Sequence, residues 1–161
     1  MKTKNGIIGI AIALALLVCL SGLPALAQDK PADNMQLVRD KIKADKKLFV
    51  SETLKLTDSE QKAFWPVYDK YQQDQMKLYD RAGALIDEYA KNYESMTEQV
   101  AKKLTDEMVV IQADQQKLKE SYLPQFRKTL PEIKVARYYQ LENKISAVVN
   151  YELAMRIPLV K

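Results

Sequence analysis

The sequence LTDSEQKAFWPVYDKY, residues 56–71, indicates the fold most clearly, because it joins a helix start to a run of aromatic residues. Its first part, Leu56, Thr57, Glu60 and Gln61, contains a helix-start signal. In a capping box of this kind, the Thr57 hydroxyl accepts a hydrogen bond from the backbone N–H of Glu60, and the Glu60 carboxylate accepts one from the N–H of Thr57. The sequence therefore predicts that a helix begins directly after Thr57.

Behind this start, aromatic side chains recur at helical spacing. Phe64, Tyr68 and Tyr71 are separated by four and three residues, and Trp65 lies beside the first of them. Such spacing places the rings on one helical face. Pro66 removes one helical hydrogen bond and is expected to kink the helix beside Trp65.

Apolar residues at spacings of three and four predict four helices, and no segment alternates as a strand does. The second and third helices are long and the turn between them is very short, so they are expected to lie antiparallel. The predicted fold class is all-α, a long antiparallel helical hairpin with a short N-terminal helix and a C-terminal helix. The first helix is predicted at about 34–50 and is followed by a connector at 51–56. The second helix is predicted from 58 to about 94. After a turn at 94–97 the third helix runs to about 129, and the fourth starts at 129–132 and ends near 156.

Further helix starts are predicted from side chains that can cap. Ser95 and Glu98 form a second capping box, and Thr97 is an alternative cap for the same helix. Thr129 with Glu132 is expected to start the last helix. The positions of these caps fix where the chain reverses direction.

The first 27 residues have the composition of a signal peptide. Lys2 and Lys4 precede an apolar run at 7–20, and an A-x-A sequence ends at Ala27. The run is shorter than the roughly 20 residues that a membrane-spanning helix needs. We therefore expect cleavage after Ala27 and a periplasmic location. The expected organisation is a signal peptide at 1–27, a disordered leader at 28–33 and a single all-α domain at 34–161.

The composition argues against several classes of chemistry. The chain contains no His, and its one Cys, Cys19, lies inside the signal peptide. The exported protein would thus lack the commonest general base, a thiol nucleophile and the usual soft metal ligands. Acidic pairs such as Asp87 with Glu88 are what a highly charged helix produces by chance. We predict a protein that is not an enzyme, with no catalytic residue, no cofactor and no metal.

The charges indicate a mixed, solvated surface. The 25 basic and 21 acidic residues are interspersed along the sequence and give a net charge of +4. Basic residues at 41–47 alternate with acidic ones, which favours a solvated helix face over a site for polyanions. Neither nucleic acid nor stable membrane insertion is expected.

The aromatic residues are the candidate contact surface for a partner. At helical spacing a single aromatic residue is more often core, but the apolar columns on the second helix are too wide for a thin monomer to enclose. Tyr and Met suit adaptable contact surfaces. The expected partners are non-native proteins or one envelope regulatory protein, and a homodimer is expected. The candidate residues are Phe64, Trp65, Tyr68, Tyr71, Tyr79, Tyr138 and Tyr139.

In the order of its predicted elements, the chain resembles the LTxxQ-motif family of small periplasmic helical proteins, the Spy/CpxP-like proteins. The motif falls on residues 56–60, where Glu60 stands in place of Gln and Gln61 follows one position later. The second motif would fall on residues 130–134, where its Thr and Gln are absent. The resemblance implies an ATP-independent chaperone, or an envelope-stress protein, that forms a cradle-shaped antiparallel dimer with clients on its concave face. The alternative is a dedicated adaptor for an extracytoplasmic sensor system.

Overall fold

The computed structural model describes residues 44–160. Within that range, every regular element is helical and none is a strand, which confirms the all-α prediction and its four α-helices. The first of these is seen from residue 44 onward. The elements are a helix at 44–54, α3 (Asp58–Asn92), the 3-10 helix η2 (Tyr93–Ser95), α4 (Glu98–Arg127) and α5 (Glu132–Arg156).

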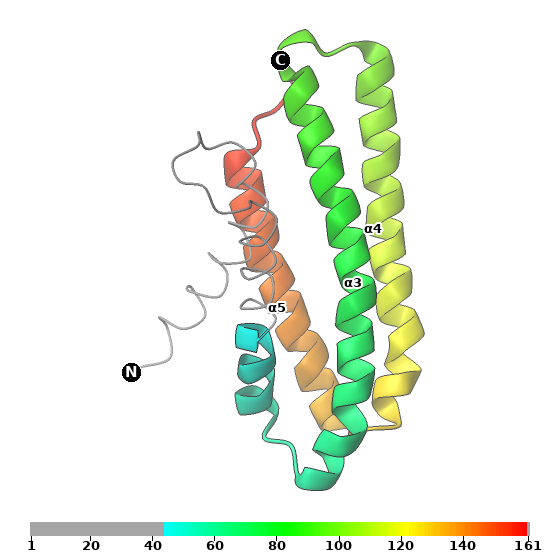
Figure 1. The fold of residues 1–161 in the computed structure, drawn as a ribbon, viewed down its shortest axis with the longest axis vertical. Coiled ribbons are helices and arrows are strands. Elements are labelled where there is room, and N and C mark those ends of the chain that lie inside the picture. The colour runs from blue at the N-terminus through cyan, green and yellow to red at the C-terminus, as the bar shows by residue number, and fades with distance from the viewer. Residues whose placement is uncertain (1–43, 161) are drawn as a thin grey trace, which may run out of the picture. The chain divides into compact units, whose positions relative to one another are not determined.

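The chain divides into two compact units. The hairpin unit comprises Leu56–Val135 with residues 159–160, and the terminal-helix unit comprises residues 44–55 with Ala136–Pro158. In the hairpin unit, α3 and α4 run antiparallel side by side and are joined by a short turn, as predicted (Figure 1). The sequence led us to expect one domain over 34–161, and α5 is the element that both units share.

The predicted capping box at the start of α3 is confirmed. The N–H of Thr57 donates to Glu60 Oε2 at 2.7 Å, and the N–H of Glu60 donates to Thr57 Oγ1 at 3.3 Å. Lys134 Nζ also donates to Glu60 Oε2, at 2.6 Å, so the start of α5 is tied to the start of α3. The helices continue through Pro66 and Pro124.

Two of the predicted caps require correction. α4 is capped by Thr97, whose hydroxyl accepts from the N–H of Val100 at 3.3 Å, whereas Ser95 belongs to η2. The expected capping box at Ser95 is therefore wrong, and the alternative cap is confirmed. Thr129 does not cap α5, because its hydroxyl donates to the carbonyl of Phe126 at 2.9 Å instead.

The first helix extends beyond its predicted end. Residues 51–54 are helical, so the expected connector at 51–56 begins too early. The helix stops at Lys55, which has a φ of 46° and whose N–H donates to the carbonyl of Ser51 at 3.1 Å. Left-handed helix ends usually carry Gly or Asn, so the Lys hid this boundary from sequence reasoning. The signal peptide, the leader and the predicted helix before residue 44 lie outside the described residues.

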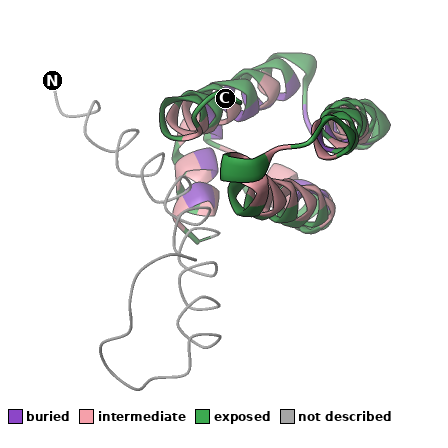
Figure 2. Ribbon diagram, turned by 90° about the horizontal axis from the view of Figure 1, so that it is seen from above, coloured by how far each residue is buried: buried purple, intermediate pink, exposed green. Residues whose placement is uncertain are grey.

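The terminal-helix unit has a buried core that contains an ion pair. Lys46 Nζ donates to Glu142 Oε2 at 3.0 Å, and both side chains are nearly inaccessible to solvent. Over the described residues, half-buried positions, in pink, outnumber buried positions, in purple (Figure 2). The buried apolar residues of this unit are Val50, Leu54, Tyr138, Leu141 and Ile145.

Candidate protein-binding surface

Five aromatic rings form the core at the base of the hairpin unit, which is the end away from the turn between α3 and α4. Phe64 lies 5.6 Å from Phe126 between ring centroids, and Tyr71 lies 5.2 Å from Tyr122 and 5.7 Å from Phe126. Tyr68 extends the cluster, at 5.6 Å from Phe64. All five side chains are buried. Offset and edge-on ring pairs at such distances add about 0.5–1.5 kcal/mol each to the free energy gained by burial.

This cluster corrects the prediction about which aromatic residues are available to a partner. The face from Phe64 to Tyr71 was expected to be too wide for one protomer to cover, but α4 supplies Tyr122 and Phe126, which cover it. A buried side chain cannot contact a partner in the folded state. Of the seven candidate residues, Phe64, Tyr68, Tyr71 and Tyr138 are buried, whereas Trp65, Tyr79 and Tyr139 are half-buried.

Polar groups at the edge of the cluster are satisfied within it. The Tyr122 hydroxyl donates to Asp74 Oδ2 at 2.7 Å, and Gln75 Nε2 donates to the Tyr71 hydroxyl at 3.3 Å. Burial, reinforced by the bond to Asp74, raises the pKa of Tyr122 to about 12. Hydrogen bonds from Lys77 and from Tyr122 hold the pKa of Asp74 below its ordinary value. This network stabilises the charged Asp74 and the neutral Tyr122.

The residues of the helix-start motif have structural partners. Gln61 Nε2 donates to the carbonyl of Leu56 at 3.2 Å, in addition to the capping box of Thr57 and Glu60. Hydrogen bonds from Lys134 and from the Thr57 backbone hold the pKa of Glu60 below its ordinary value. The motif therefore positions the start of α3.

Beyond the aromatic cluster and Gln75, no residue of α3 is buried. Gln75 is its last buried residue, and every apolar side chain from there to the turn is half-buried or exposed. We call residues 76–111 the distal hairpin. On α4 this region contains two buried residues, Leu104 and Ile111. Its large apolar residues that are not buried are Met76, Leu78, Tyr79, Leu85, Ile86, Tyr89, Tyr93, Met96, Val100, Met108, Val109 and Val110.

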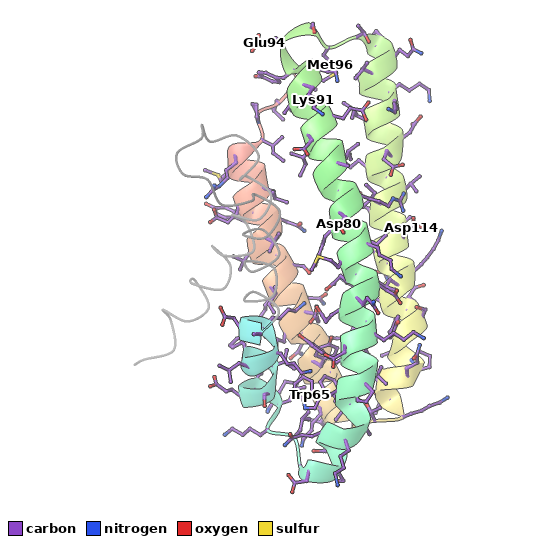
Figure 3. All side chains as sticks on the ribbon, viewed as in Figure 1. Trp65, Asp80, Lys91, Glu94, Met96 and Asp114 are labelled. Carbon is purple, nitrogen blue, oxygen red and sulfur yellow. The ribbon has the colours of Figure 1, made fainter. Side chains whose placement is uncertain are left out.

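One arginine ties the two helices of the distal hairpin together. Arg81 Nη1 donates to Asp114 Oδ2 at 2.8 Å, and its Nη2 and Nε donate to Glu107 Oε1 at 2.9 and 3.2 Å. Figure 3 labels Asp114 at the middle of α4, far from Met96 at the turn. The bond from Arg81 holds the pKa of Asp114 below its ordinary value, and the two carboxylates raise the pKa of Arg81. The arginine therefore fixes the register of α3 against α4.

Sequence reasoning missed this arginine, although a signal for it existed. Once the turn is placed near Ser95, residues at similar distances before and after it face each other. That rule puts Arg81 opposite the part of α4 that contains Glu107 and Asp114.

A groove lies between the two helices in the distal hairpin. Its volume is about 640 Å³, and Leu85 and Val110 are among its apolar lining residues. Each of the three carboxylates that line the groove forms an ion pair with a basic side chain. These pairs are Glu88 with Lys103 at 2.7 Å, Glu107 with Arg81 at 2.9 Å, and Asp106 with Lys102.

This arrangement offers contact area and paired charges. Among residues 44–160, no group of three or more metal-binding side chains is close enough together to hold a metal ion. None of the helices described there is both long enough and apolar enough to cross a membrane.

No protein-family model, no curated protein and no solved structure matches this chain.

Proposed function

We propose that this chain is an exported protein that binds non-native proteins without ATP and has no enzymatic activity, using the distal hairpin as its contact surface. The observation that carries the proposal is the incomplete burial of apolar side chains there. From Met76 to Tyr93, α3 and the start of η2 present aromatic and aliphatic residues of which none is buried. Apolar area that residues 44–160 leave uncovered is typical of a protein-binding surface.

The chemistry of the distal hairpin suits loose, adaptable binding. Tyr79, Tyr89 and Met108 combine apolar area with polar or polarisable groups and fit many partner shapes. Charged side chains at the groove are already paired with one another, so they can surround an apolar contact without each needing a charge on the client. Surface ion pairs of this kind contribute little free energy, typically 0–1 kcal/mol, and can exchange partners easily.

The resemblance to Spy/CpxP-like proteins, the predicted signal peptide and the helical hairpin agree with this proposal. They also support an alternative, in which the chain is a regulatory module with one dedicated partner in an extracytoplasmic sensor system. Both functions could use a homodimer. They differ in the number of partners and in how tightly each is bound.

Aggregation of a reduced model client tests the proposal directly. The processed protein at stoichiometric amounts should suppress light scattering, and Tyr79→Ser with Ile86→Ser should weaken the suppression severalfold. Ile133→Ser with Tyr151→Ser is the matched control, because it removes two exposed apolar residues outside the distal hairpin. No suppression with several clients, or equal weakening by both pairs, would contradict the proposal.

A pull-down from periplasm separates the two candidate functions. A chaperone should capture many proteins weakly, whereas an adaptor should capture one at stoichiometric yield. Tyr79→Ser with Ile86→Ser shows whether the captured proteins use the distal hairpin.

A further inference from the structure

The solvent-facing side of α5 differs in charge from that of the hairpin helices. α3 and α4 both expose carboxylates, such as Asp87 and Glu120. From Ala136 to Arg156, by contrast, α5 has no fully exposed acidic residue. Glu142 is buried against Lys46, and the half-buried Glu152 lies 3.7 Å from Arg156. This part of the helix therefore presents basic and neutral groups to solvent.

Six exposed residues form what we call the outer face of α5. Arg137, Lys144 and Tyr151 follow one another at intervals of seven residues, or about two helical turns, and so lie along one line of the helix. Met155 stands one turn beyond Tyr151. The outer face consists of Arg137, Lys144, Ala147, Tyr151, Ala154 and Met155.

The apolar part of this face is unusually accessible. Tyr151 is 63% exposed and Met155 is 69% exposed, although the opposite side of the same helix supplies buried residues such as Tyr138 and Leu141. The helix is thus apolar on two sides, and a surface helix with one polar side would not show this pattern. Something is expected to cover Tyr151 and Met155.

The two cations of this face have no partner in the part of the chain that the structure describes. Neither Arg137 nor Lys144 forms an ion pair or a hydrogen bond with its side chain there. A face that combines unpaired cations with exposed Tyr and Met and has no exposed acid is complementary to a surface of phosphate groups over an apolar layer. The same face of a second copy would fit worse, because it offers no exposed carboxylate to pair with Arg137 and Lys144.

We propose that the outer face of α5 binds reversibly to an anionic membrane surface. The helix lies flat, so that Arg137 and Lys144 meet lipid phosphates while Tyr151 and Met155 enter the interface between headgroups and acyl chains. This inference needs no membrane-spanning helix. It goes beyond the proposed function and does not depend on it, since it uses other residues than the distal hairpin does.

Vesicle sedimentation of the processed protein tests this proposal. The protein should bind vesicles of phosphatidylglycerol mixed with phosphatidylcholine and leave phosphatidylcholine vesicles unbound. A basic residue near an anionic surface strengthens binding about fivefold, so Arg137→Gln with Lys144→Gln should lower the partition coefficient by about thirtyfold. Tyr151→Ser with Met155→Ser should also lower it, because the apolar contact is lost.

Matched controls separate the outer face from net charge and from general hydrophobicity. Lys62→Gln with Lys91→Gln removes the same charge from exposed positions of α3, and Met108→Ser with Val109→Ser removes exposed apolar groups from α4. Both control variants should bind vesicles like the parent. Unchanged thermal midpoints would show that all four variants are folded.

Several results would overturn the proposal. These are equal binding to both kinds of vesicle, no binding to either, or equal losses in the control variants. Binding of soluble polyglutamate in preference to vesicles would assign the face to an acidic protein. A dimer that dissociates on Arg137→Gln with Lys144→Gln, without vesicle binding by the parent, would assign it to a second copy.

Discussion

Thr57 sets the position at which the longest helix of the chain begins. Its hydroxyl and the Glu60 carboxylate satisfy backbone N–H groups that the helix itself leaves unpaired. The carbonyl of Leu56, the residue before Thr57, accepts a hydrogen bond from the side chain of Gln61. The capping box of Thr57 and Glu60 is local and does not depend on the rest of the fold, and for that reason the sequence predicted it correctly.

Replacing Thr57 by Ala should therefore destabilise the protein without altering its fold. The expected loss is about 1 kcal/mol in the free energy of unfolding, which is the usual contribution of an N-cap side chain. Urea unfolding followed by circular dichroism measures it. Thr57→Ser keeps the hydroxyl and should retain most of the stability, and an unchanged midpoint for Thr57→Ala would contradict the assigned cap.

Tyr122 makes the stability of the folded protein decrease at alkaline pH. Its pKa rises from the ordinary value of 10.0 to about 12 in the folded state, so the folded protein keeps a proton that the unfolded chain releases. Stability from this group is fully present below pH 10 and is lost as the pH rises toward 12, because there the unfolded state binds fewer protons.

Tyr122→Phe should remove this component of the pH dependence. Between pH 10 and 12, the variant should lose less stability than the parent in denaturant titrations at fixed pH. Tyr151→Phe is the matched control, since Tyr151 is exposed. Parallel pH profiles for the parent and Tyr122→Phe would show that Tyr122 has no raised pKa in the folded protein.

At the scale of single elements, α3 has two parts with different means of attachment to α4. Its first part packs through Phe64, Tyr68 and Tyr71, which are buried among aromatic residues of α4. Its distal part has no buried residue and is joined to α4 by ion pairs, with Arg81 at their centre. Few buried contacts imply that the distal hairpin opens more readily than the base.

Arg81→Met should loosen the distal hairpin selectively. Amide hydrogen exchange should become faster around Leu85 and Leu104, with little change near Phe64 and Phe126. The loss in global stability should be smaller than that of Thr57→Ala, because the ion pairs are partly exposed to solvent.

Arg81→Lys tests whether the geometry of the guanidinium matters. An ammonium group carries its donors on one nitrogen and cannot reproduce the geometry in which three nitrogens of Arg81 reach Glu107 and Asp114, so exchange should lie between that of the parent and that of Arg81→Met. High salt should reduce the differences among the three proteins. Equal acceleration of exchange in the base and in the distal part would contradict the division of α3.

At the scale of the whole chain, one buried ion pair connects residues that are far apart in sequence. Lys46 and Glu142 are 96 positions apart and bring the helix at 44–54 against α5. A helix in a folded protein gains most of its stability from packing, so the helix seen at 44–54 relies on this contact and on the buried side chains of Val50 and Leu54. Within the terminal-helix unit, the pair determines which turn of α5 the short helix meets.

Breaking the pair should cost more than removing it. Lys46→Met leaves the Glu142 carboxylate buried without its cation and should lower the free energy of unfolding by about 3–5 kcal/mol. The double variant Lys46→Met with Glu142→Leu should recover much of that loss, because neither charge then remains buried. Chemical denaturation of the single and double variants provides the cycle. Additive losses would show that the two charges do not interact.

The sequence by itself determined the all-α class, the helical hairpin, the cap at Thr57 and the alternative cap at Thr97. These follow from interactions between residues a few positions apart, which helical periodicity makes visible. The cap expected at Thr129 and the early end of the first helix were wrong for a related reason. Thr129 instead donates to a carbonyl of the preceding turn, and Lys55 adopts a backbone conformation that its side chain does not signal.

Only the tertiary structure decided which aromatic residues are covered and which are left accessible. Burial of Phe64 and Tyr71 depends on Tyr122 and Phe126, which are about fifty positions or more away in sequence, so periodicity within α3 could not reveal it. The pairing of Arg81 with Glu107 and Asp114 depends on the register of the hairpin in the same way. Contacts between distant residues are set by how whole helices pack, and this packing moved the candidate binding surface from the start of α3 to the distal hairpin.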